Sequence, residues 1–488
     1  MAPAACRVPL HLPAAGPKIE WNHKEYGEKT GCEGVFCLEE TACKTRVRFT
    51  RRDLARLLAP LVVEQFLAVT VGMADTMMVS YAGEAAISGV SLVDMLNVLI
   101  INIFAALATG GAVVISQYLG ARDVPSAKNS AGQLFHLAAL AGVSIMVLAL
   151  AFARPLLRLL FGQIEPEVTD AALLYLRISA ASYPFIALYN AGAALFRSMG
   201  NSKISMQVSI LMNVVNVAGN AICVFGLGLG VAGVALPSLV SRALAAGLIL
   251  WRASNPMNRV HVRPAQCLRL KKGLALRILN IGIPSAFENS LFQLGRVLVV
   301  SIISVFGTAQ ISANAVANNL DSIGCIPGQA IGLGLITVVG QCIGAQDQKA
   351  AIGYTKKLVG LTYVVDGTLN LLVILGMPLL LGLYNISAET YQIAWMLVLI
   401  HCACGIVLWP VSFVLPNALR AANDVRFTMV VSIASMMIWR LGFSYVLGIG
   451  FGMGAVGVWI AMVIDWVCRS AFFVGRFVSG KWKTKYRA

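Results

Sequence analysis

The sequence predicts an all-α polytopic membrane protein, with twelve transmembrane helices in two pseudo-symmetric six-helix lobes. Of its 488 residues, 58% are hydrophobic and 12% are charged, about half of the roughly 25% that is usual in soluble domains. Apolar stretches long enough to cross a bilayer follow one another along the chain. The second half also repeats the pattern of the first half at an offset of 224 residues. These three observations together indicate the fold class.

Twelve apolar stretches meet the length of about 20 residues that a transmembrane helix needs. They lie near residues 56–80, 86–118, 127–152, 168–194, 203–226, 231–252, 275–303, 311–342, 350–381, 388–418, 427–448 and 453–477. Several exceed the minimum length, so we expect helices that are tilted or that extend beyond the bilayer.

The basic residues gather in three segments, at residues 1–56, 251–277 and 476–488. Cytoplasmic loops of membrane proteins carry an excess of Lys and Arg, so we expect both termini and the middle segment in the cytoplasm and the protein in the plasma (inner) membrane. The same distribution accounts for the net charge of +16 without a nucleic-acid partner. The loop with Arg154 and Arg158 is an exception, because it is expected on the opposite side.

The internal repeat divides the chain into two halves. The phrase "SQYLGARD" near residue 116 returns as "GQCIGAQD" near residue 340. Because six is an even number, both halves run in the same direction, which implies a pseudo-twofold axis along the membrane normal. We expect a disordered cytoplasmic extension at 1–50, an N-terminal six-helix lobe at 51–252, a basic cytoplasmic linker at 253–274, and a C-terminal six-helix lobe with a basic tail at 275–488.

Four segments carry a resemblance to a known family. The run "PLVVEQFLAVTVGMADTMMVSYAGEAAISGVS" resembles the first helix and following loop of the multidrug and toxic compound extrusion (MATE) transporters. The segments "QYLGARD", "LFRSMGNSK" and "GVAGVALPS" are similar to the same family, and the resemblance covers residues 54–480. It implies a V-shaped pair of lobes and a secondary active antiporter that exports organic, often cationic, compounds in exchange for Na⁺ or H⁺.

Asp75 is the first candidate for the ion-coupling residue. An ionised side chain at mid-bilayer costs roughly 2.5–3.5 kcal/mol, so it needs a partner, a wet cavity or a proton. Glu64 lies about three helical turns earlier, which puts both carboxylates on one stripe of the helix. The resemblance implies the same role, because the coupling-ion carboxylate of the family occupies the position that Asp75 matches. The alternative is that Asp75 only bonds a neighbouring helix.

The fifth stretch carries Asn213, Asn216 and Asn220, whose spacing puts three amides on one helix face. The amides could bind a cation or link helices by hydrogen bonds. In relatives with a described cation site, Asn216 would match an Asn ligand and Ser238 a hydroxyl ligand, whereas Asn220 stands where some members carry a second Asp. A single carboxylate makes a weaker Na⁺ site, so H⁺ remains an alternative. Beyond this coupling ion, Na⁺ or H⁺ at Asp75, Asn216, Asn220 and Ser238, we expect no metal and no cofactor.

The second half does not copy this site, because Val299 stands opposite Asp75. It carries other ionisable residues within its stretches, and we assign five positions to a substrate or charge network: Glu64, Glu288, Arg296, Asp366 and Arg440. The family's Glu on the seventh helix lies one turn after Glu288, and the match with Glu64 equally suggests paired structural carboxylates. We expect Arg296 and Arg440 to neutralise nearby acids, with Asp366 or Glu288 as partners. His401 is a single histidine without metal-ligand spacing.

These features predict multidrug efflux of organic, cationic and amphipathic compounds by a monomer that handles small molecules within the lipid bilayer. A flippase for a lipid-linked precursor, on a related fold, is the alternative, but the N-terminal half has few basic residues in its stretches for the charged groove that this needs. An enzyme would need a catalytic constellation, and no HExxH, GxSxG or Walker loop occurs. A channel is a further alternative, but a repeat with an acidic site in only one half favours alternating access.

Overall fold

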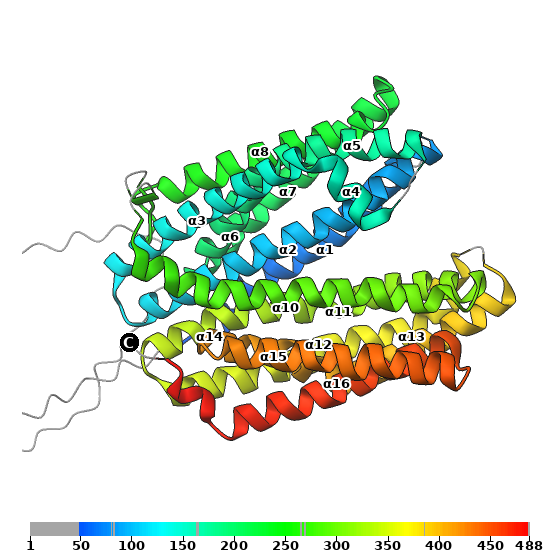
Figure 1. Ribbon diagram of the computed structural model, residues 1–488. Helices are drawn as coiled ribbons and strands as arrows, with labels where there is room; N and C mark the ends of the chain where they lie inside the picture. Colours follow the sequence, from blue (N-terminus) through cyan, green and yellow to red (C-terminus); the bar gives the residue numbers. More distant parts are fainter. Residues whose placement is uncertain are drawn as a thin grey trace, which may run out of the picture.

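The computed structural model is helical in all its regular elements, within the part of the chain that it describes (Figure 1). That part comprises residues 48–79, 81, 83–162, 165–263, 266–267, 270–384 and 386–486. Within it, eleven helices are long and apolar enough to cross a membrane, and a bent helix pair makes a twelfth candidate span. The predicted all-α membrane fold with twelve spans in two lobes is therefore confirmed. The extension expected at 1–50 lies almost entirely outside the described residues.

The N-terminal lobe follows the predicted stretches closely. Its helices are α1 (Arg51–Val79), α2 (Glu84–Gly120), α3 (Val124–Ala151), α4 (Ala153–Phe161), α5 (Pro166–Ala181), α6 (Tyr183–Ser198), α7 (Ser202–Ala221) and α8 (Ala232–Ser254). The fourth predicted stretch is broken, because α5 and α6 meet at an angle of 44°. Pro184 explains the break, since it has no backbone N–H to continue the helical hydrogen bonds.

The C-terminal lobe repeats this order. Its helices are α10 (Lys272–Ser304), α11 (Thr308–Gly344), α12 (Gln348–Gly382), α13 (Ala388–Trp409), α14 (Leu415–Ala421), α15 (Val425–Ser435) and α16 (Gly454–Val478). The span that begins with α15 widens into π-helical turns at Met436–Gly442 and Ser444–Gly450, and α7 widens in the same way at Ile222–Gly226. The fifth span of each half therefore contains π-helical turns.

The two lobes lie against each other at the end that carries the linker and diverge toward the opposite end (Figure 1). The close contacts between lobes agree with this view. A Cβ atom added to Gly282 of α10 would lie 3.2 Å from Leu107 Cα of α2, and Gly334 of α11 packs against Leu58 of α1. These positions fall near the starts of α1 and α10 and toward the ends of α2 and α11. The arrangement is a V that is closed at the linker end.

The repeated phrase forms the tightest of these contacts. Gly120 and Gly344 are the last residues of α2 and α11, and a Cβ atom on either would overlap backbone of the other lobe. The Cβ atom of residue 120 would meet the carbonyl oxygen of Gln341, and that of residue 344 would meet the carbonyl oxygen of Gln117. Only glycine allows the two helix ends to approach this closely.

The glutamines of the same phrase complete the contact with hydrogen bonds between lobes. Gln117 Nε2 donates to the carbonyl oxygen of Ala421 at 2.9 Å, and Gln341 Nε2 donates to the carbonyl oxygen of Ser198 at 2.9 Å. Each glutamine thus satisfies a carbonyl at the helix end where the fourth span of the other lobe terminates. The two copies of the phrase face each other across the pseudo-twofold axis.

The end of each phrase turns the chain into the next helix. Arg122 and Gln346 have φ angles of 61° and 57°, in the left-handed region that a tight turn requires. Asp123 and Asp347 follow, and their side chains accept hydrogen bonds from the backbone N–H three residues later, at 3.0 and 2.9 Å. The aspartates therefore cap α3 and α12 in the same way.

A buried glutamate ties the first helix of the N-terminal lobe to its neighbours. Glu64 of α1 accepts hydrogen bonds from Tyr189 Oη at 3.2 Å and from Ser205 Oγ at 3.0 Å. Its Oε1 also lies 3.8 Å from Arg197 Nη1. These contacts satisfy a carboxylate that is 8% exposed.

Glu288 has the corresponding position on α10, with a tighter ion pair. Its Oε1 accepts hydrogen bonds from Arg420 Nη2 and from Ser432 Oγ, both at 2.6 Å. The residue is 4% exposed. Each half therefore neutralises the acid of its first helix with an arginine near the end of its fourth span.

Gly120→Ala should separate the lobes at the linker end, because the backbone carbonyl of Gln341 cannot move aside without shifting α11. We expect a loss of about 1–3 kcal/mol for this arrangement. Spin labels at the exposed Lys203 and Lys349 should report longer and broader distances in double electron–electron resonance. Gly360→Ala is the matched control, because nothing lies within 4 Å of a Cβ atom there. Identical distances in both variants would contradict the role of the crossing.

Glu288→Gln should destabilise the protein by about 3–5 kcal/mol, because it leaves the guanidinium of Arg420, whose side chain is only 15% exposed, without its ion-pair partner. Glu64→Gln should have a smaller effect, since its arginine is 3.8 Å away. Thermal unfolding in detergent would rank the two variants against Glu84→Gln, a change at an exposed position. An equal midpoint for all three would show that the pairs do not stabilise the lobes.

Candidate functional site

Four of the predicted site residues meet inside the N-terminal lobe, on α1, α7 and α8. Asn220 Nδ2 donates to Asp75 Oδ1 at 2.7 Å. Asn216 Nδ2 donates to Ser238 Oγ at 2.8 Å, and its Oδ1 lies 3.5 Å from Asn220 Nδ2. The structure therefore links Asp75, Asn216, Asn220 and Ser238 into one chain of polar contacts.

The local sequence explains how these side chains reach one another. Asn216 and Asn220 are four residues apart, so they lie on the same face of α7. Between them, Gly219 packs against α8 so closely that a Cβ atom would lie 2.7 Å from Pro237 Cβ. This approach brings the next residue of α8, Ser238, within reach of Asn216. The π-helical turn that follows α7 is the kind of irregularity found at functional sites.

One acceptor of this cluster is unused. Asn220 is completely buried, and its Oδ1 has no hydrogen-bond partner among the residues that the structure describes. A buried polar atom without a partner is unusual and calls for an explanation such as an ion. Oxygens from a carboxylate, amides and a hydroxyl are the ligands that hard cations take. The cluster can therefore hold a small cation, or a proton on Asp75.

A second carboxylate, which the sequence interpretation overlooked, lies in the same lobe. Asp94 of α2 accepts hydrogen bonds from Tyr175 Oη at 3.0 Å and from Asn97 Nδ2 at 3.1 Å. Tyr183 Oη in turn donates to Asn97 Oδ1 at 2.9 Å. The signal was present in the sequence, because Asp94 is an acid within the predicted stretch 86–118.

Arg242 of α8 is the basic member of this group and corrects the expectation that the N-terminal half has little cationic charge inside its spans. Its Nη1 donates to Ser182 Oγ at 2.7 Å. It interacts electrostatically with both Asp75 and Asp94. With all three groups ionised, two carboxylates and one guanidinium leave one net negative charge. A monovalent cation or a proton would neutralise it.

The charged residues expected to form a network in the C-terminal lobe are arranged differently from the prediction. Glu288 pairs with Arg420, not with Arg296 or Arg440, because its partner is set by the helix contacts that both halves share. Arg296 is exposed, and the Arg440 guanidinium lies 5.6 Å from the ring centroid of Phe292.

Asp366 of α12 also lacks the arginine partner that we expected. It is 2% exposed, and neither of its carboxylate oxygens has a hydrogen-bond partner within the described part of the chain. Trp409 and Asp366 both pack against the open side of Gly328. An unpaired charge is costly in such surroundings.

Two charged residues of α16 take part in the C-terminal lobe instead. Asp465 accepts a hydrogen bond from Ser435 Oγ at 2.5 Å. Arg469 donates to Ser432 Oγ at 3.2 Å, and its guanidinium lies 4.5 Å from the ring centroid of Phe413. Both were detectable as charges inside the predicted stretch 453–477, although their partners were not.

The chain is similar to known proteins over most of its length. It is 29% identical over 445 residues to the uncharacterized transporter YisQ of Bacillus subtilis (strain 168), which covers 89% of this chain and 95% of the relative. It is 24% identical over 453 residues to the probable multidrug resistance protein NorM of Thermotoga maritima, with coverages of 91% and 95%.

Solved structures share the fold. A MOP superfamily transporter from Pyrococcus furiosus has a TM-score of 0.82 at 21% identity, over 89% of this chain and 96% of that chain. A multidrug resistance MATE family transporter in an outward-facing conformation has a TM-score of 0.83 at 20% identity, with the same coverages.

The family model MatE matches residues 60–222 and again residues 284–446. The two matches start 224 residues apart, at the offset of the internal repeat, and together they cover more than half of the chain. The chain therefore belongs to the MatE family of multi-pass membrane transporters.

Proposed function

We propose that this protein is a secondary active antiporter that exports organic, cationic and amphipathic compounds in exchange for one inward-moving Na⁺ or H⁺. The observation that carries the proposal is the buried cluster of Asp75, Asn216, Asn220 and Ser238, with its unused Asn220 acceptor. Several relatives of similar length are named as probable multidrug resistance proteins, which supports the substrate class.

The charge balance of the N-terminal lobe supports a single coupling ion. Asp75, Asp94 and Arg242 together carry one net negative charge when ionised. One positive charge that moves inward gains about 2.3 kcal/mol per 100 mV of membrane potential. Each tenfold concentration gradient adds about 1.4 kcal/mol. The sum is enough to drive export of a neutral substrate against a gradient. For a monovalent cationic substrate a one-for-one exchange moves no net charge, so the concentration gradient of the coupling ion drives it alone.

The position of the cluster suggests how exchange could occur. Asp75 lies one turn before the end of α1, at the diverging end of the lobes, whereas the linker end is closed (Figure 1). If the basic linker and both termini lie in the cytoplasm, the open end faces outward and the ion enters from outside. Binding at Asp75 then favours substrate release and the inward return, as the lobes alternate between the two sides.

The remaining expectations belong to the same proposal. The protein would act in the plasma membrane as a monomer, with small molecules as substrates and without catalysing a chemical reaction. The alternative of a flippase for a lipid-linked precursor is not favoured, because several relatives are named as probable multidrug resistance proteins.

Asp75→Asn should reduce gradient-driven transport to background, at least tenfold below wild type, because the amide keeps the shape but cannot exchange a positive ion. The measurement is dye uptake into everted vesicles under a Na⁺ gradient and a pH gradient, each imposed separately. The gradient that drives uptake in wild type identifies the coupling ion. Asp170→Asn, at an exposed acid of α5, is the control. Undiminished uptake by Asp75→Asn would overturn the mechanism.

Asn220→Asp should strengthen Na⁺ binding at least tenfold, because a second carboxylate joins the cluster and ligand charge sets cation affinity. Titration of purified protein with NaCl, followed by calorimetry, measures this affinity. Asn213→Asp places the same charge about two turns away on the same helix and serves as the control. If the two variants bound Na⁺ equally, the cluster would not be the cation site.

A further inference from the structure

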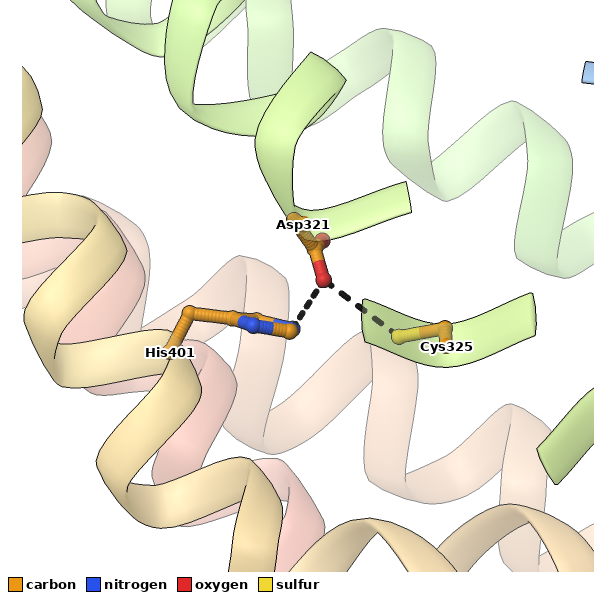
Figure 2. A group of neighbouring side chains, drawn as sticks. All are labelled: Asp321, Cys325 and His401. Carbon is orange, nitrogen blue, oxygen red and sulfur yellow. Dashed lines mark hydrogen bonds and ion pairs between the residues drawn. The ribbon is translucent and has the colours of Figure 1, made fainter. Parts of the chain in front are cut away.

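Three potential metal ligands converge in the C-terminal lobe, on helices α11 and α13 (Figure 2). His401 Nε2 lies 2.5 Å from Asp321 Oδ1, and Cys325 Sγ donates to the same oxygen at 3.4 Å. The three ligand atoms all lie within 4.8 Å of one another. Figure 2 shows the imidazole and the thiol pointing at the carboxylate from opposite sides. None of these residues belongs to the Asp75 cluster.

His401 belongs to this group of ligands, although it has no metal-ligand spacing along the chain. Asp321 and Cys325 are four residues apart and share one face of α11. His401 comes from α13, which packs against that face. Ligands that are distant in sequence thus meet through helix packing, as they do in metal sites of helical bundles.

We propose that Asp321, Cys325 and His401 form a binding site for a divalent transition-metal ion of the Zn²⁺ class. Imidazole nitrogen, thiolate sulfur and carboxylate oxygen are the ligands of Zn²⁺ in proteins. With these bond lengths, tetrahedral ligand atoms are about 3.3–3.5 Å apart for N and O, and about 3.5–3.7 Å apart for pairs with sulfur. The separation of 3.4 Å between Cys325 Sγ and Asp321 Oδ1 is close to this range. The contact between His401 Nε2 and Asp321 Oδ1 has to open by about 0.8 Å, and His401 Nε2 and Cys325 Sγ, which lie within 4.8 Å of each other, have to reach the same tetrahedral separation.

Charge and burial favour a dication at this place. The carboxylate of Asp321 and the thiolate of Cys325 carry two negative charges, so the occupied site has no net charge, and the thiol proton leaves as the metal binds. A neutral site suits an apolar membrane lobe. His401 is 2% exposed and Cys325 is 9% exposed, whereas the side chain of Asp321 is 20% exposed. The ion therefore enters from the side of Asp321.

Aromatic residues hold the histidine in position. The rings of Trp459 and Trp466 meet the imidazole in T-shaped contacts, with centroids 5.8 and 5.0 Å away. Trp459 is fixed in turn by a hydrogen bond from its Nε1 to Asn314 Oδ1 at 3.0 Å. Surroundings that orient a ligand improve metal affinity. Three protein ligands leave the fourth coordination position open, and the bound metal ties α11 to α13.

The test is a titration of the purified full-length protein in nanodiscs, after reduction and removal of metals, with Co²⁺ as the spectroscopic probe. We expect one equivalent to produce the visible bands of tetrahedral Co²⁺ and a near-ultraviolet sulfur-to-cobalt band, both displaced by Zn²⁺. Cys325→Ser should abolish the sulfur band, and His401→Ala should weaken binding at least tenfold. Cys404→Ser, one turn from His401 on α13, should bind as wild type does.

The wild-type titration alone can overturn the proposal, since the absence of a saturable tetrahedral Co²⁺ signal would contradict it. A sulfur band that persists in Cys325→Ser would assign binding to another thiol and would contradict it as well. Metal content of the monodisperse fraction of each variant, measured by mass spectrometry, restricts the comparison to folded protein. The readout is binding and not transport, so its failure would leave the proposed coupling at Asp75 unaffected.

Discussion

The close crossing of α2 and α11 is the contact on which the rest of the structure depends. Two glycines at the helix ends, Gly120 and Gly344, let each helix press against backbone of the other lobe. Gln117 and Gln341 then bond carbonyl groups across the gap. The other contacts between the lobes join the start of α1 to α11 and the start of α10 to α2. Because these contacts lie at one end, the opposite ends of the lobes are free to diverge. A motion that exposes one side and then the other needs such a localised contact, with stiff lobes on either side of it.

Within each lobe, buried acids are paired with basic or hydrogen-bonding side chains of neighbouring helices. A membrane interior makes an unpaired charge expensive, so each acid in the spans has to find an arginine, a set of hydrogen-bond donors, a metal or a proton. Glu64 and Glu288 use the first two solutions and link the first helix of each half to its fourth and fifth spans. Asp75 differs because its hydrogen bond comes from a neutral amide, Asn220, rather than from an arginine, and an acceptor beside it stays unused. That difference separates a structural acid from one that can exchange an ion.

Features that depend on neighbours along the chain could be predicted from the sequence. Features that depend on helix packing could not, apart from the grouping of Asp75 with Asn216, Asn220 and Ser238, which the family resemblance implied. Hydropathy located the spans, and the 224-residue offset revealed the two halves. The spacing of Asn216 and Asn220 placed their amides on one face. The partner of Glu288 was predicted wrongly, because the side chain of Arg420 reaches it from α14, which is remote from α10 in sequence. The interactions of Arg242 with Asp75 and of His401 with Asp321 were not predicted for the same reason, since each pair joins helices that are remote in sequence.

The crossing has a further property that follows from its geometry. Each helix end supplies both the hollow and the backbone that fills the hollow opposite, so the contact is of the isologous kind found between identical subunits. A substitution in one copy of the phrase therefore changes the contact of the other copy, so the sequences of the two copies can change only together. The Asp75 cluster has no counterpart in the other half, because Val299 stands at the position that matches Asp75. The contact therefore constrains the two halves to the same architecture, whereas their polar side chains can differ.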